Sequence, residues 1–301
     1  MGGRGPTGER WLIPRGHLPA FRAAQRLIYL VVLLTACSAQ GPGFVSPNSP
    51  YVVTPAPVAL AMLTLAGVTP DDVVYDLGSG DGRLVVAAAQ RFGARGVGVE
   101  LDANLIRESG ENALRAGVSE RVTFLWRDLF ATDVSAATVV TLYLGEPVNL
   151  RLRPKLLSEL RPGTRVVSHA FGMADWEPDR VERYRDQERA STLYLWIVPA
   201  AVEGTWRFTL PAAGRDRSCR LRLAQRFQSV HATLTVDGAE VPVERVALVG
   251  DHLRIATTPQ PQADWPSLVL DGRLADGEIR GEVKRDPTTG AVGPPWRARR
   301  D

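Results

Sequence analysis

Apolar positions along residues 51–200 follow two patterns that alternate with each other. Short runs of branched apolar residues are typical of buried strands, and longer segments with apolar residues three or four apart are typical of helices. The expected helices are residues 55–66, 83–92, 103–116 and 149–160, and the expected strands are residues 73–77, 96–101, 122–126, 138–144, 164–168 and 193–198. This alternation predicts a doubly wound, mostly parallel, Rossmann-like α/β sheet with its ligand site at the carboxyl ends of the strands.

The pattern changes beyond residue 200, where helical spacing disappears. Short β-rich runs are separated there by turn pairs such as Asp237-Gly238 and Gly250-Asp251, which is typical of an antiparallel meander. The expected strands are residues 205–210, 218–224, 229–236, 243–249, 252–256 and 267–270. We therefore place a domain boundary near residue 202, with an α/β domain over 51–201 and a small antiparallel all-β meander or barrel over 202–301.

Residues 1–37 form a leader of a different kind. The apolar run 27–34 follows five arginines and is well short of the roughly 20 residues that cross a bilayer, so it suits the core of a signal peptide. Leu34-Thr35-Ala36-Cys37 resembles a lipobox, which predicts a membrane-associated lipoprotein lipidated at Cys37. A retained apolar helix is one alternative, and a misassigned start, which would leave the protein cytoplasmic, is another. Residues 38–50 are rich in Gly, Ser and Pro and are expected to be a linker.

The charge of the chain belongs mainly to the leader. The full sequence of 301 residues has 36 basic and 33 acidic residues, a net charge of +3. Residues 1–36 hold five arginines against one glutamate, so the remainder is close to neutral and has no basic stripe interleaved with aromatic residues. We therefore expect no nucleic-acid partner. The four histidines and two cysteines lack the spacing of metal ligands, so no metal site is expected either.

The turn after the first expected strand has the sequence DLGSGDGR, residues 76–83. Its alternate glycines allow positive φ and close approach of a ligand to the backbone, and the following helix offers free N–H groups. A dinucleotide site needs GxGxxG, but Arg83 follows the third glycine directly. The acidic side chains of Asp76 and Asp81 instead suit a cofactor with ammonium and sulfonium groups, which predicts S-adenosylmethionine rather than NAD.

Acidic residues also stand at the ends of the next two expected strands. Glu100 lies 24 residues after Asp76, where a carboxylate can accept both ribose hydroxyls of the cofactor. Asp128 follows the third strand and could accept the adenine amino group, and Leu129 or Phe130 could pack on the ring. The cofactor contacts expected from these patterns are Asp76, Gly78, Ser79, Gly80, Gly82, Glu100, Asp128 and Leu129.

Residues 51–55 (YVVTP) and 74–83 (VYDLGSGDGR), with TLYL at 141–144 and PGTRVVSH at 162–169, resemble class I S-adenosylmethionine-dependent methyltransferases. The group in question contains the membrane-associated lysine methyltransferases of the ATP synthase c subunit and the adenine nucleotide translocase, with bacterial relatives. The resemblance covers roughly residues 51–200 and implies a methyltransferase that acts on a protein lysine. It supports the cofactor residues above and adds Thr54. Ala170 departs from the acidic residue expected there.

Methyl transfer is an in-line displacement that depends on positioning and requires no covalent nucleophile on the enzyme. A lysine acceptor must be neutral, and Tyr143, Glu146 and Asn149 at the tip of the fourth strand are placed to orient it or accept its proton. Of these we expect Tyr143 and Asn149 to act on the acceptor. The alternatives are a packed strand residue for Tyr143 and a helix N-cap for Asn149. His169 is more typical of a hydrogen-bonded residue than of a base. A small-molecule methyltransferase and a lipid-anchored binding module with a degenerate methyltransferase fold remain alternative functions.

Overall fold

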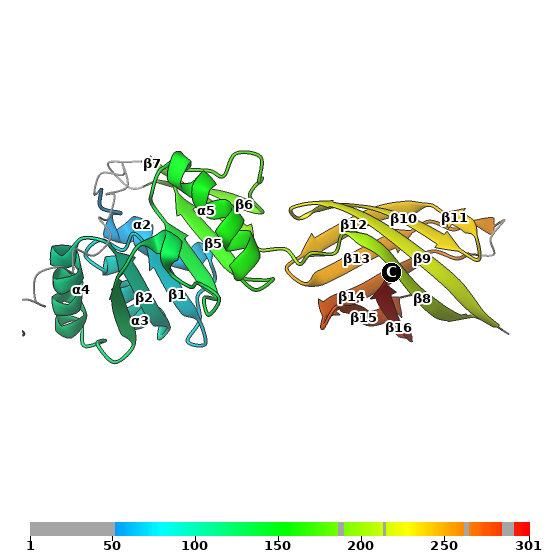
Figure 1. Cartoon of the computed structure of the whole chain (residues 1–301), viewed down its shortest axis with the longest axis horizontal. Helices are drawn as coiled ribbons and strands as arrows, with labels where there is room; N and C mark the ends of the chain where they lie inside the picture. The colour runs from blue at the N-terminus through cyan, green and yellow to red at the C-terminus, as the bar shows by residue number, and fades with distance from the viewer. Residues whose placement is uncertain (1–51, 186–189, 213–214, 262–264, 285–291) are drawn as a thin grey trace, which may run out of the picture. The chain divides into compact units, whose positions relative to one another are not determined.

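A computed structural model of the chain describes residues 52–185, 190–212, 215–261, 265–284 and 292–301 (Figure 1). The expected leader, the linker and Cys37 lie outside these residues. Within the described ranges, no helix is both long enough and apolar enough to cross a membrane.

The first sheet has seven strands in the order β3-β2-β1-β4-β5-β7-β6. Their bounds are β1 Val73–Leu77, β2 Arg95–Glu100, β3 Val122–Trp126, β4 Val139–Leu142, β5 Arg165–His169, β6 Arg180–Arg185 and β7 Ala190–Ile197. Strands β1 to β5 are parallel, whereas β7 runs antiparallel to both β5 and β6. The expected mostly parallel α/β sheet is confirmed. Strand β6 was not expected, because its sequence RVERYR has the charged composition of a surface segment.

Helices pack on both faces of this sheet (Figure 1). They are α2 Ala56–Leu65, α3 Arg83–Phe92, α4 Ala103–Arg115 and α5 Glu146–Glu159, with a 3-10 turn η1 at Leu129–Ala131. Because side chains alternate along a strand, Val139 packs with α2 and α3 while its neighbour Val140 packs with α5 on the opposite face. Helix α5 begins at Glu146 and its N-cap is Gly145, so the expected start at Asn149 and the N-cap alternative for that residue are wrong.

The second sheet has nine strands in the order β11-β10-β9-β8-β16-β15-β14-β13-β12, and the pairings between neighbours are antiparallel. Their bounds are β8 Gly204–Ala212, β9 Arg215–Arg226, β10 Ser229–Val236, β11 Ala239–Val241, β12 Val243–Val249, β13 His252–Thr257, β14 Leu268–Ala275, β15 Glu278–Lys284 and β16 Val292–Arg300. The first strand of this sheet pairs with its last, and β10 also lies against β12, so the sheet is nearly a closed barrel around one apolar core.

Three strands of this sheet, β11, β15 and β16, were not expected from the sequence. In β15 only Ile279 and Val283 point into the core, and the positions between them are charged residues or glycine. The two ends of the meander meet at Trp206, whose ring lies 4.7 Å from the Arg300 guanidinium carbon. Arg300 also donates a hydrogen bond of 2.6 Å to the Ala201 carbonyl oxygen, which ties the last strand to the segment that precedes the first.

Candidate active site

The glycine-rich turn lies at the point where the chain order of the first sheet divides. Strand β1 pairs with β2 on one side and with β4 on the other, so Asp76 lies opposite Gly98 and Thr141. In open α/β sheets, ligands bind at the carboxyl ends of the strands at this kind of division. The turn between β1 and α3 therefore occupies the expected position for a nucleotide-like ligand.

The backbone of the turn requires glycine. Gly78, Gly80 and Gly82 have φ of +82°, +54° and +75°. A Cβ on Gly78 would lie 2.5 Å from Leu144 Cδ2, and a Cβ on Gly82 would lie 2.5 Å from Phe124 Cε1. Both the left-handed conformation and the close packing exclude other residues, so the turn is a tight cradle that begins α3.

Helix α4 fixes the backbone of this turn through two side-chain hydrogen bonds. Ser109 Oγ donates to the Gly80 carbonyl oxygen at 2.9 Å, and Asn112 Nδ2 donates to the Asp81 carbonyl oxygen at 2.8 Å. The Asp81 carboxylate forms an ion pair of 2.6 Å with Arg83. Because this arginine already compensates Asp81, Asp76 is the acidic group of the turn that can meet a cationic ligand.

Asp76 is a buried carboxyl with one short hydrogen bond. Its Oδ1 accepts from Thr141 Oγ1 at 2.8 Å, and the side chain is otherwise enclosed by the sheet. Burial, together with the nearby charges of Glu100 and Asp81, raises its pKa to about 7, although the hydrogen bond from Thr141 lowers the pKa. A cationic group next to Asp76 would reverse this effect, since it would stabilise the ionised carboxylate.

Glu100 closes the side of the cradle toward β2. Its Oε2 accepts from Gly80 N at 3.0 Å, and its Oε1 accepts from the backbone N–H groups of Leu101 at 2.7 Å and Asp102 at 3.0 Å. Three backbone donors therefore fix the carboxylate in one orientation beside the turn, where ribose hydroxyls could reach it. Among the described residues, the Ser79 hydroxyl in the same turn is buried without a hydrogen-bond partner. A cradle with an unsatisfied hydroxyl fits a polar ligand.

The two residues expected near the adenine lie in different surroundings. Asp128 is the N-cap of η1, and its Oδ1 accepts from Phe130 N at 2.9 Å. Leu129 is buried in the apolar core, so its expected contact with the ring stays a prediction. The sequence patterns missed Trp126, which lies opposite Glu100 at the end of β3 and is 60% exposed. Its indole N–H donates to the Leu101 carbonyl oxygen at 2.8 Å. A large exposed aromatic residue at a strand end was the available signal.

A second group of side chains lies beyond β4 and β5. The Tyr143 ring stacks on His169 with 4.0 Å between centroids and lies 6.0 Å from the Phe171 ring. His169 is buried, with Nδ1 3.4 Å from Thr54 Oγ1 and Nε2 3.2 Å from Ser191 Oγ, and burial lowers its pKa. His169 is thus a neutral, hydrogen-bonded support for the tyrosine. Thr54 belongs to this aromatic group, and its expected contact with the cofactor stays a prediction.

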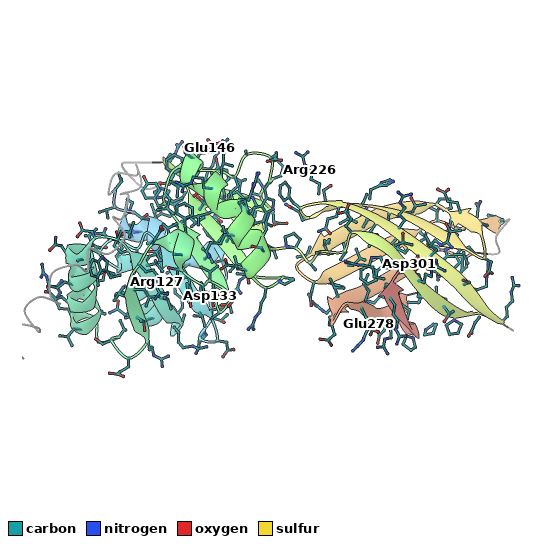
Figure 2. The ribbon with its side chains drawn as sticks, in the orientation of Figure 1. Arg127, Asp133, Glu146, Arg226, Glu278 and Asp301 are labelled. Atoms are coloured by element: carbon teal, nitrogen blue, oxygen red, sulfur yellow. The ribbon has the colours of Figure 1, made fainter. Side chains whose placement is uncertain are left out.

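Asn149 lies behind the aromatic group rather than in it. The side chain is fully buried, and Nδ2 lies 3.1 Å from Ser168 Oγ, 3.2 Å from the Phe171 carbonyl oxygen and 3.3 Å from the Gly172 carbonyl oxygen. Its Oδ1 is buried without a hydrogen-bond partner among the described residues. Asn149 therefore ties α5, which begins at Glu146 (Figure 2), to the loop after β5. This arrangement makes it a positioning residue for Phe171.

Residues 76–180 match the family model described as the ANTKMT methyltransferase domain. A protein-lysine N-methyltransferase from Saccharolobus islandicus is 45% identical over 153 residues, which make up 50% of this chain and 95% of that protein. The chain belongs to this methyltransferase family. It is an S-adenosylmethionine-dependent methyltransferase, as the glycine turn and its acidic partners predicted.

Two further proteins similar to this methyltransferase are named for different substrates. The adenine nucleotide translocase lysine N-methyltransferase of Mus musculus is 37% identical over 129 residues, which cover 43% of this chain and 56% of the mouse enzyme. A solved RNA methyltransferase from Salinibacter ruber, in complex with S-adenosyl-L-homocysteine, is 52% identical with a TM-score of 0.48 and covers 50% of this chain and 96% of that one. The proteins from Saccharolobus islandicus and Salinibacter ruber each match 50% of this methyltransferase, so about half of its chain has no counterpart in either.

The cradle of this methyltransferase fits S-adenosylmethionine. Asp76 and Glu100 offer carboxylates for a cationic amine and for ribose hydroxyls, the turn leaves no room for a Cβ at Gly78 or Gly82, and Ser79 offers an unpaired hydroxyl. Beyond the cradle, the residues that follow β4 and β5 form the aromatic group of Tyr143, His169 and Phe171. The carboxyl edge of the first sheet thus carries two groups of side chains: the polar cradle around Asp76 and Glu100, and the aromatic group around Tyr143.

Proposed function

We propose that this methyltransferase transfers a methyl group to the side-chain amine of a lysine in a protein. The observation that supports this proposal is the stack of Tyr143, His169 and Phe171. The stack lies next to the end of β4, the strand whose Thr141 donates a hydrogen bond to Asp76. Tyr143 stands two residues after Thr141, whose hydroxyl donates to Asp76, so the stack and the cradle share one strand end. The names of the relatives from Saccharolobus islandicus and Mus musculus support lysine as the acceptor.

Aromatic surroundings favour the reactive form of a lysine. Removal of the amine from water disfavours its charged form and lowers its pKa, so a larger fraction is neutral and nucleophilic. Phe171 is 37% exposed and can cover the methylene chain of the acceptor, while the Tyr143 ring is held by His169. Tyr143 then positions the amine through its hydroxyl, and the stack excludes water from the reacting pair.

When bound, S-adenosylmethionine would supply a sulfonium methyl group: the neutral acceptor amine would form the new C–N bond as the C–S bond breaks and the thioether leaves, and the proton of the methylated ammonium would pass to solvent. Asp76 binds the cationic end of the cofactor, and Glu100 holds its ribose against the turn. Asn149 fixes the loop that carries Phe171, so that the acceptor enters along one direction. Because the buried His169 is neutral and engaged at both ring nitrogens, it supports Tyr143 and does not take up the acceptor proton.

The test is transfer of tritium from methyl-labelled S-adenosylmethionine to extracts of cells that lack the gene. We expect label in protease-sensitive, RNase-resistant material, with methylated lysine after hydrolysis, and none with the Asp76→Asn variant. Label in RNA or in small solutes would overturn the proposal that lysine is the acceptor, although the protein would still be a methyltransferase. An absence of both transfer and cofactor binding would favour the degenerate binding module.

We also propose that the enzyme is attached to a membrane through its leader. The support is the sequence LTAC at residues 34–37 after the apolar run 27–34. Mass spectrometry of the mature protein from membranes should find Cys37 as a lipid-modified first residue. An unprocessed Met1, or a start beyond Cys37 without lipid, would contradict this location.

A further inference from the structure

The outer face of the second sheet carries arginines that lie directly opposite one another on neighbouring strands. Arg207 on β8 faces Arg220 on β9 and Arg299 on β16. On the other side of β16, Arg297 faces Arg280 on β15, which in turn faces Arg273 on β14. We call these six side chains the arginine row: Arg207, Arg220, Arg273, Arg280, Arg297 and Arg299. The sequence neighbours Trp206, Leu221 and Ala298 are buried in the core, whereas all six arginines are exposed, as expected for alternate positions along a strand.

Such an arrangement works against folding. Directly opposite residues on antiparallel strands have Cβ atoms about 5 Å apart, and like charges at that distance repel each other. The row contains four direct arginine–arginine pairs across five adjacent strands. At about 4.8 Å between strands, it extends about 20 Å across the sheet. A repulsive arrangement of this length suggests that a partner provides the opposite charge.

Carboxylates of the same sheet compensate only part of this charge. Glu278 pairs with Arg280 at 2.8 Å and Arg299 at 2.9 Å, and it also pairs with Arg297. These pairs hold the pKa of Glu278 at about 2.

The arginines of the row that do not contact Glu278 have at most one acidic partner each. Arg207 pairs with Asp301 and Arg273 with Asp251, each at 2.5 Å (Figure 2 shows Glu278 and Asp301 on this sheet). Among the described residues, Arg220 forms no ion pair, so three carboxylates face six guanidinium groups. The row keeps an excess of positive charge.

The chemistry of the row suits phosphate groups at a surface. Guanidinium groups bind phosphate oxygens with two parallel hydrogen bonds. The described part of the second sheet exposes no large aromatic side chain, and its one large exposed apolar residue is Val249. Proteins that bind single strands combine a basic groove with aromatic residues on which bases stack. The described part of the second sheet offers the basic side chains without such an aromatic platform, so the row favours a lipid surface over a single-stranded nucleic acid.

We propose that the arginine row docks the second sheet onto a membrane rich in anionic phospholipids. Basic residues near a membrane surface are attracted to anionic lipids, and this attraction adds to that of any lipid anchor. The sequence supplies a candidate anchor at Cys37, before the described residues, and the row adds the electrostatic attraction. Docking of this kind keeps the enzyme at the membrane independently of methyl transfer.

The test is sedimentation of the full chain with vesicles of phosphatidylcholine, with and without 30% phosphatidylglycerol. The row variant is Arg207→Gln with Arg220→Gln and Arg299→Gln. Each basic residue near an anionic surface contributes about fivefold in affinity, so the row variant should bind the anionic vesicles about 100-fold more weakly. Added salt should weaken the wild type in the same direction. Since the readout is binding, failure of the proposed methyl transfer would leave this result unchanged.

The matched control removes three exposed arginines from the first domain, as Arg91→Gln with Arg95→Gln and Arg107→Gln. Equal binding of the row variant and this control to anionic vesicles would overturn the proposal. The proposal would also be overturned if the row variant bound a labelled RNA more weakly than the wild type but bound vesicles equally well. Arg220→Gln alone breaks no ion pair and should fold normally. It should still weaken vesicle binding about fivefold, and unchanged binding of this folded variant would also overturn the proposal.

Discussion

Binding of S-adenosylmethionine should depend on pH through Asp76. Burial raises the pKa of this carboxyl to about 7 in the free enzyme, and the cationic end of the cofactor favours its ionised form. If only the ionised form binds, about three quarters of the enzyme is competent at pH 7.5 and only about 3% at pH 5.5. The affinity should therefore fall about 25-fold across this window, and the protein should release a proton on binding at the lower pH.

The assay is calorimetric titration between pH 5.5 and 7.5, where the cofactor amine, with a pKa of about 7.7–8.0, stays largely protonated. Asp76→Asn keeps the shape of the side chain but should bind weakly at every pH, with no dependence. Asp71→Asn is the matched control, because it removes an exposed carboxylate from the segment that precedes the same strand, and it should behave like the wild type. Wild-type affinity that stays constant over this window would refute the reasoning.

Asp76→Asn should raise the free energy of unfolding at pH 8 by at most about 4 kcal/mol, because the folded pKa of about 7 exceeds the unfolded value of about 3.9. This gain should shrink as the pH falls from 7 to 4, which thermal denaturation can follow. Gly82→Ala should place a methyl group against Phe124, cost about 1–3 kcal/mol and abolish cofactor binding by calorimetry. Tyr143→Phe should lower kcat at least tenfold with little change in cofactor Kd, measured by tritium transfer. Asn149→Leu should raise the acceptor KM and cost about 2 kcal/mol, whereas retained KM would contradict its positioning role.

The parts of the fold that the sequence predicted are those where burial dictates composition. Strand β4 is fully buried and strand β1 mostly so, and each is therefore mainly apolar, apart from Thr141 in β4 and Asp76 in β1. Strand β6 lies at the edge of the first sheet, and strand β15 has one exposed face. Both strands therefore contain charged residues, which the sequence pattern did not identify as strand. The start of α5 was misplaced by three residues, although Pro147 in its first turn is a standard signal for a helix start.

The site could be predicted only where it depends on chain order. Asp76 and Glu100 lie near the carboxyl ends of the consecutive strands β1 and β2, so their positions at one edge of the sheet are a consequence of parallel pairing. The stack of Tyr143 on His169 depends on β5 lying beside β4, and the bond from His169 to Ser191 depends on β7 lying beside β5. The arginine row depends on register between strands, because its members stand at alternate positions and form no basic run.

The most direct measurement of the central claim is a crystal structure of the enzyme with S-adenosyl-L-homocysteine. We predict the amine end of the ligand at the glycine turn beside Asp76, the ribose on Glu100, the adenine toward Asp128, and the sulfur facing the aromatic group of Tyr143. A ligand bound elsewhere, or a sulfur that faces away from Tyr143, would contradict the assignment of the cradle and the acceptor side.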